Sequence, residues 1–112
     1  MKLVRDNIPG MHARGELGPH PDKPHRERQS FRKATPEEYR LLLRTKLAEE
    51  VGEVLSAVFQ EHRLEELADV YEVLVSLIHA EGWMLRDVEQ QAEKKSQRYG
   101  SLCEGWVLEE KK

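Results

Sequence analysis

The chain has 112 residues, of which 35% are charged, 38% hydrophobic and 6% aromatic, and its formal net charge is -3. A chain this short forms one domain, here residues 1–112, and buries limited surface, so we expect a homo-oligomer built mainly from helices. The negative charge argues against a nucleic-acid partner, because nucleic-acid-binding domains are usually basic. The single cysteine and the lack of an apolar leader or long apolar run predict a cytoplasmic protein with no membrane partner.

The N-terminal third predicts an extended start followed by a loop. Lys2-Leu3-Val4 and then Arg5-Asp6-Asn7-Ile8-Pro9 precede a segment, residues 10–33, in which glycines and prolines interrupt any apolar periodicity. This segment is predicted to be a flexible loop. Its histidines, His12, His20 and His25, match no structural zinc spacing, and a solvated loop explains them better than a metal site does.

A first long helix is predicted from Pro36 to about Gln60. Thr35 can cap it, Pro36 suits its first position, and Glu38 stands where a capping box needs an acid. Its apolar residues recur at spacings of three and four and form one stripe that should pack against other helices; they are Leu43, Leu47, Val51, Val54, Leu55 and Val58.

Two further helices follow in the sequence. One is predicted from about Leu64 to Glu81, ended by Gly82, with a short turn near residues 61–63 that makes it antiparallel to the first. Its apolar residues cover most of its circumference, which predicts a central helix enclosed by others. The last helix is predicted from about Leu85 to Arg98, and residues 102–108 should form a short strand or an extended arm.

Acidic residues border the apolar stripes of both long helices. Glu50 and Glu53 are three residues apart on the first helix, and Glu66 and Asp69 have the same spacing on the second. Antiparallel helices would bring these four carboxylates together, and their mutual repulsion would raise their pKa values unless a cation were bound. A site with only oxygen ligands favours Mg²⁺ or Mn²⁺ and suits phosphate chemistry.

These acids have two competing interpretations. A di-iron carboxylate bundle needs Glu-x-x-His motifs, but no glutamate stands three residues before His62 or His79. Solvated helix faces with intrahelical pairs, such as Lys46 with Glu50, explain any one acid well. Two acid pairs that both border apolar stripes favour a site.

The acids also form a recognisable pattern. Glu49-Glu50-Val51-Gly52-Glu53, then Glu66-Leu67-Ala68-Asp69 after a short gap, resembles the signature of the MazG-like all-α nucleotide pyrophosphohydrolases. Val4-Arg5-Asp6 with Ile8-Pro9 resembles the opening of their phosphoribosyl-ATP pyrophosphohydrolase-like subgroup. The resemblance implies an all-α antiparallel helical bundle of the all-α NTP pyrophosphatase type, completed by other copies in a homodimer or homotetramer.

The resemblance further implies a catalytic site for a nucleotide substrate. Glu50, Glu53, Glu66 and Asp69 would hold magnesium, and Glu49 would complete this set or orient the attacking water. Water would attack the α-phosphorus, with the monophosphate and pyrophosphate as products. Basic residues would bind the phosphates, and the candidates are Lys46, Lys94, Lys95, Arg98 and Arg5. A cationic helix end explains Lys94, Lys95 and Arg98 equally well, and a salt bridge that anchors the N-terminus would explain Arg5.

The chain departs from the family pattern at two places. Asn7 stands where the subgroup often has lysine, and Tyr99-Gly100-Ser101-Leu102 replaces a Gly-Gly-Phe-like turn. Both departures weaken the assignment of substrate-binding residues by resemblance to the family more than they weaken the assignment of the metal site. The alternative function is a non-catalytic helical oligomer that acts as a binding or regulatory module, but five retained acids beside apolar stripes favour the enzyme.

Overall fold

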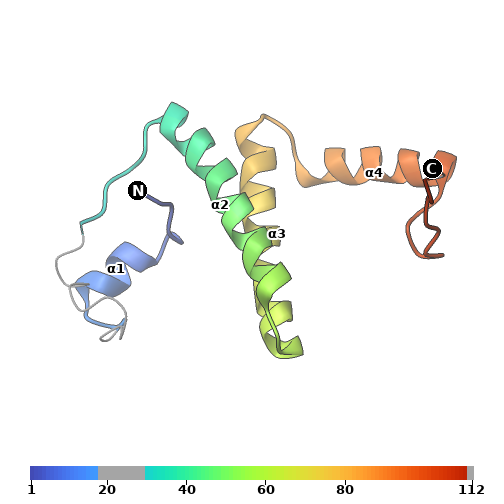
Figure 1. The fold of residues 1–112 in the computed structure, drawn as a ribbon. Coiled ribbons are helices and arrows are strands. Elements are labelled where there is room, and N and C mark those ends of the chain that lie inside the picture. The colour runs from blue at the N-terminus through green and yellow to red at the C-terminus, as the bar shows by residue number, and fades with distance from the viewer. Residues whose placement is uncertain (18–29, 111–112) are drawn as a thin grey trace. The chain divides into compact units, whose positions relative to one another are not determined.

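The computed structural model describes residues 1–17 and 30–110, and it is all-helical in these ranges (Figure 1). The helices are α1 (Ile8–Ala13), α2 (Pro36–Ser56), α3 (Gln60–Ala80) and α4 (Leu85–Tyr99), and the described ranges contain no strand. The chain divides into two compact units, Met1–Leu74 and Val75–Lys112. Within the described residues, no helix combines the length and apolar character needed to cross a membrane.

Helix α1 corrects the start of the loop predicted over residues 10–33, since residues 10–13 are helical, while residues 18–29 of that loop lie outside the described residues. Pro9 occupies the first turn of this helix, and the backbone N–H of Met11 donates to the carbonyl of Asn7 at 3.0 Å. Proline is well suited to that position because its φ is already helical. His12 lies in this helix with its ring 5.3 Å from that of Phe31, whereas His20 and His25 lie outside the described residues.

Helix α2 begins where the sequence predicted and ends earlier. The Glu38 N–H donates to Thr35 Oγ1 at 3.2 Å and the Thr35 N–H donates to Glu38 Oε1 at 3.0 Å, which confirms the capping box. The helix stops at Ser56 rather than near Gln60, because Ala57 adopts extended backbone angles. Val58 therefore belongs to the connection between helices and not to the predicted stripe.

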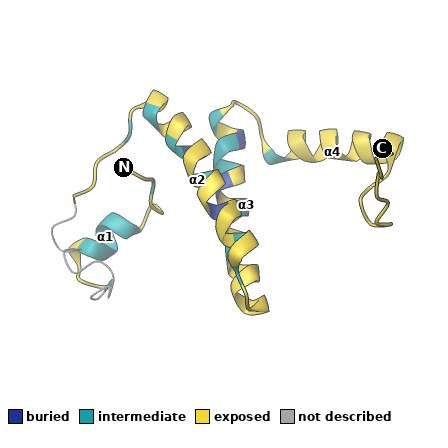
Figure 2. Ribbon diagram, in the orientation of Figure 1, coloured by how far each residue is buried: buried dark blue, intermediate teal, exposed yellow. Residues whose placement is uncertain are grey.

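In the first unit, α2 and the start of α3 form an antiparallel hairpin (Figure 1). The turn spans residues 57–59, a few residues before the predicted 61–63, so α3 begins at Gln60 rather than near Leu64. Leu43 and Val73 are buried here, at 3% and 8% exposure. Leu67 and Tyr71 are half exposed. The prediction that other helices enclose α3 is therefore not met within the described residues, where much of α3 is exposed (Figure 2).

In the second unit, α3 ends and α4 begins as predicted to within a few residues. Gly82 has a φ of 90°, and the Trp83 N–H donates to the carbonyl of Ile78 at 3.1 Å, an arrangement that terminates a helix and favours glycine. Asp87 Oδ2 accepts from the Met84 N–H at 2.8 Å and caps α4. Gly100, with a φ of 86°, follows its end, and residues 105–110 have no helix or strand.

Candidate metal centre

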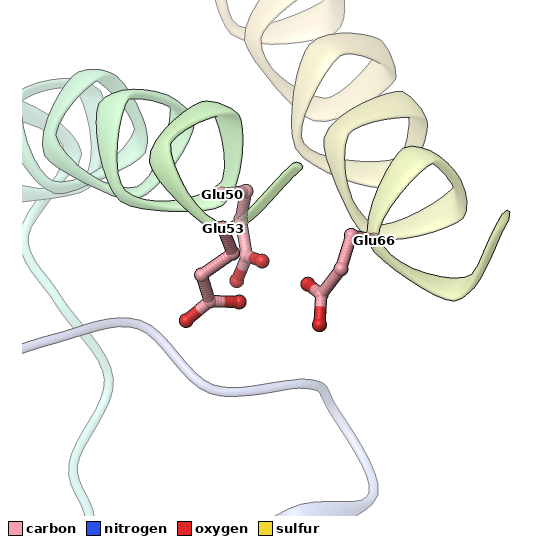
Figure 3. Close-up of side chains that lie close together, drawn as sticks. All are labelled: Glu50, Glu53 and Glu66. Atoms are coloured by element: carbon pink, nitrogen blue, oxygen red, sulfur yellow. The ribbon is translucent and has the colours of Figure 1, made fainter. Parts of the chain in front are cut away.

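Three glutamates from the two long helices converge in the first unit. Glu50 and Glu53 project from neighbouring turns of α2, and Glu66 projects from α3 toward them (Figure 3). Each residue offers one carboxylate oxygen, and these three oxygens lie within 4.8 Å of one another. The turn at residues 57–59 produces this arrangement, because it folds α3 back along the last turns of α2.

Glu50 is the buried member of the cluster, with 6% of its surface exposed. Its Oε1 lies 3.3 Å from the Lys46 ammonium, so the intrahelical pair anticipated from the sequence is present. Its Oε2 is buried and has no hydrogen-bond partner, and the same is true of Glu66 Oε2. Buried carboxylate oxygens without a partner are unfavourable, so a cation or a hydrogen-bond donor beside these two oxygens would stabilise the cluster.

The raised pKa values of Glu50 and Glu53 also indicate that the clustered carboxyl groups would be stabilised by a cation. Burial raises the pKa of Glu50, and the neighbouring carboxyl of Glu53 raises it further, while Lys46 opposes the change. The pKa of Glu53 is raised chiefly by its contact with Glu66. Carboxyl oxygens in contact repel one another unless a proton or a cation lies between them. The raised pKa values of Glu50 and Glu53 therefore reflect burial and repulsion that a bound cation would relieve.

The donor set fits a hard divalent cation. All three groups are carboxylates, and among the described residues no histidine or cysteine joins the cluster. Magnesium prefers oxygen ligands and commonly takes only part of its coordination shell from protein, with water and substrate phosphate completing it. Three convergent carboxylates, two of them with an unpartnered buried oxygen, suit that requirement.

Asp69, the fourth predicted ligand, has a different partner in this structure. Its Oδ1 accepts a hydrogen bond from Arg5 Nη2 at 2.6 Å, and it is not among the three converging acids. This bond is the main reason that the pKa of Arg5 is raised, and the charges of Glu72 and Glu50 add to it. Arg5 thus lies close enough to the cluster for the charge of Glu50 to act on it. It also forms a salt bridge, as the sequence analysis allowed, and the partner is Asp69.

The remaining predicted residues occupy varied positions. Glu49 is exposed on α2, where its charge contributes to the raised pKa of Glu53. Lys94, Lys95 and Arg98 are exposed on α4, in the second unit. The Arg98 guanidinium lies 5.1 Å from the centre of the Tyr99 ring, a cation–π contact within α4.

One feature of the site was not anticipated from the sequence. A hollow of about 510 Å³ opens beside the cluster, with Glu53 and Glu66 in its wall. Phe59 and His62 also line it, and their rings meet edge to face with centres 5.5 Å apart. The predicted first helix ran through Phe59, which concealed its position at the turn.

No protein-family model, curated protein or solved structure matches this chain. The residues of the site are therefore the basis for assigning a function.

Proposed function

We propose that the protein is a magnesium-dependent nucleotide pyrophosphohydrolase that converts a nucleoside triphosphate or related nucleotide to its monophosphate and pyrophosphate. The observation that carries the proposal is the convergence of Glu50, Glu53 and Glu66, with buried oxygens that have no partner. The resemblance of the acid pattern to that of the MazG-like enzymes supports the same assignment. A homodimer or homotetramer is part of the proposal.

In this proposal Glu50, Glu53 and Glu66 hold the cation, which when bound supplies Lewis-acid stabilisation of charge on the phosphates. Lys46 keeps the Glu50 carboxylate oriented through its 3.3 Å contact with Oε1, which leaves Oε2 for the cation. Glu49 is exposed near Glu53. Its carboxylate accepts a hydrogen bond from the attacking water, which orients the water, and then takes up the water's proton.

Arg5 and Asp69 act as a pair in the proposed reaction. The guanidinium of Arg5 is more than half exposed and lies in the field of the acids, so it can donate to an incoming phosphate. If Arg5 turned to the phosphate, the Asp69 carboxylate would be free to serve as a fourth ligand of the cation. The Arg5–Asp69 bond would then link substrate binding to completion of the ligand set.

The test is pyrophosphate release from a panel of nucleoside triphosphates, deoxynucleotides and phosphoribosyl-ATP, with Mg²⁺, Mn²⁺ or chelator. We expect selective release that chelator abolishes, and a loss of at least about 100-fold in Glu53→Gln and Glu66→Gln, since even outer-shell changes lower metal affinity or activity 10- to 100-fold. Glu61→Gln is the matched control, because Glu61 is an exposed acid of α3 outside the cluster.

Full activity in Glu53→Gln or Glu66→Gln would remove the metal-site assignment. Magnesium binding without release of pyrophosphate from any nucleotide in the panel would favour the non-catalytic binding module instead. Circular dichroism of each variant establishes that a loss of activity reflects the site and not the fold.

A further inference from the structure

The hollow beside the acid cluster has two chemically different walls. Glu53 and Glu66 form one wall, and both belong to the proposed metal centre. Val58, Phe59 and His62 form the other, at the turn between α2 and α3. The hollow has a volume of about 510 Å³ and is broadly open to solvent.

The apolar wall is exposed although its side chains are large. Phe59 is 62% exposed and Val58 is 78% exposed, so neither contributes to a core within the described chain. The edge-to-face contact with His62 nevertheless orients the Phe59 ring, with an interplanar angle of 87°. An oriented, exposed aromatic pair directly beside a charged cluster suits a ligand that has a planar ring as well as an anionic group.

A polar group completes this wall. The Ser56 hydroxyl lines the hollow and donates its hydrogen to the carbonyl of Gly52 at 2.8 Å. Its oxygen therefore remains as an acceptor for an N–H group of the ligand. A ring with an N–H donor at its edge, attached to phosphates, meets all three features of the hollow.

We propose that this hollow binds the base of the nucleotide, with the Phe59 ring as the stacking surface, His62 as the residue that orients this ring, and Ser56 as an acceptor for a base N–H. The inference rests on the proposed function, since the phosphates of the same ligand would reach the cation held by Glu53 and Glu66. It makes Phe59 and His62 the residues that distinguish a nucleotide from a bare polyphosphate.

The experiment measures binding without turnover, by calorimetry of the full chain with Mg²⁺. The ligands are the α,β-methylene analogues of ATP, GTP, CTP and UTP, in which the bond between the α- and β-phosphorus cannot be hydrolysed, and inorganic tripolyphosphate. The variants are Phe59→Ala, Phe59→Trp and His62→Ala. Leu41→Ala is the matched control, because Leu41 is an apolar residue of α2 that is 60% exposed and does not line the hollow.

We expect Phe59→Ala to weaken binding of the best nucleotide analogue about 10-fold, the effect typical of losing one base–aromatic stack. His62→Ala should weaken it in the same direction. Binding of tripolyphosphate should be unchanged in both variants, Phe59→Trp should restore nucleotide binding, and Leu41→Ala should change the binding of neither ligand.

Four results would overturn the inference. Equal weakening of nucleotide and tripolyphosphate would mean that Phe59 supports the acids and not the base, and unchanged nucleotide binding in Phe59→Ala would place the base elsewhere; both leave the proposed function standing. A change of oligomeric state in Phe59→Ala, measured by sedimentation velocity, would show that the hollow is a contact between copies. Failure of the wild-type protein to bind any of these ligands would remove the proposed function along with the inference.

Discussion

Two acids of the same motif have basic partners of different kinds. Glu50 is buried and keeps Lys46, one helical turn away, whereas Asp69 is 36% exposed and pairs with Arg5, 64 residues away in sequence. The first pair belongs to one helix and moves with it. The second pair joins α3 to the N-terminal segment, and the Arg5 guanidinium binds the Asp69 carboxylate that the proposed metal centre would use as a ligand. Arg5 and the cation would therefore compete for Asp69.

We expect Arg5→Gln to bind Mn²⁺ about two- to fivefold more tightly than the wild type, because an exposed ion pair contributes up to about 1 kcal/mol. Electron paramagnetic resonance of bound Mn²⁺ measures the affinity. Arg14→Gln is the matched control, since Arg14 forms an exposed ion pair of the same 2.6 Å length with Glu16. A gain that persists in an Asp69→Asn background would contradict competition and indicate only a general effect of charge.

Helix ends were predictable where a side chain or a glycine defines them. Thr35 and Glu38 form the expected capping box, and Gly82 and Gly100 follow α3 and α4 with positive φ. The ends without such a signal were placed wrongly. Neither glycine nor proline marks the turn at residues 57–59, and α1 was missed because Gly10 lies in its middle. Backbone hydrogen bonds alone define these elements, and the sequence pattern does not display them.

At the start of α2 we expect Thr35→Ala to lower the free energy of unfolding by about 1 kcal/mol, the usual effect of removing an N-cap. Hydrogen bonds from Arg32 and from the Thr35 N–H hold the pKa of Glu38 at about 2. Because this pKa is lowered in the folded state, the contribution of Glu38 is present above its ordinary pKa of 4.5 and disappears as the pH falls toward 2.

Thermal melts at pH 7 and pH 3 measure both effects. Glu38→Gln should lower the melting temperature at pH 7 and narrow the difference between the two pH values. Glu37→Gln, in the same helical turn but outside the capping box, is the control. If Glu38→Gln and Glu37→Gln behave alike, the capping box does not stabilise the helix.

The candidate site was predictable to the extent that it depends on helical spacing. Glu50 and Glu53 lie together because they are three residues apart on α2, and the antiparallel arrangement of α3 brings Glu66 to them. The bond between Arg5 and Asp69 was not predictable, because no periodicity relates residues 64 positions apart. The aromatic pair was missed for a different reason: its position depends on where the turn falls, and the turn was placed a few residues too late.

The described part of the chain buries few of its apolar side chains. Its buried hydrophobic residues are Leu43, Val73 and Ile78. In the first unit, an exposed apolar stripe follows α3 at spacings of three and four residues, and it consists of Leu64, Leu67, Tyr71 and Leu74. A continuous apolar stripe of this kind on a helix normally faces another helix. It supports the proposal that other copies of the chain complete the core.

We expect sedimentation velocity to show a dimer or a tetramer. Replacing Leu67 and Tyr71 together with Asp should dissociate it, because each introduced charge would have to be buried at the interface. Leu102→Asp is the control, since Leu102 is 97% exposed in the C-terminal segment and belongs to no helix. A wild-type protein that sediments as a monomer, or an assembly unaffected by the double substitution, would contradict this assignment of the stripe.

The contact between Lys46 and Glu50 bears on how many ions the site can hold. With all three clustered acids ionised and Lys46 protonated, two negative charges remain, which a single divalent cation would neutralise. Asp69 and Arg5 cancel one another and leave that balance unchanged. A second divalent cation would leave an excess of positive charge unless the phosphates of a substrate arrived with it. For the proposed metal centre this charge balance predicts one ion per site before substrate binds, and a second ion would enter as a complex with the nucleotide.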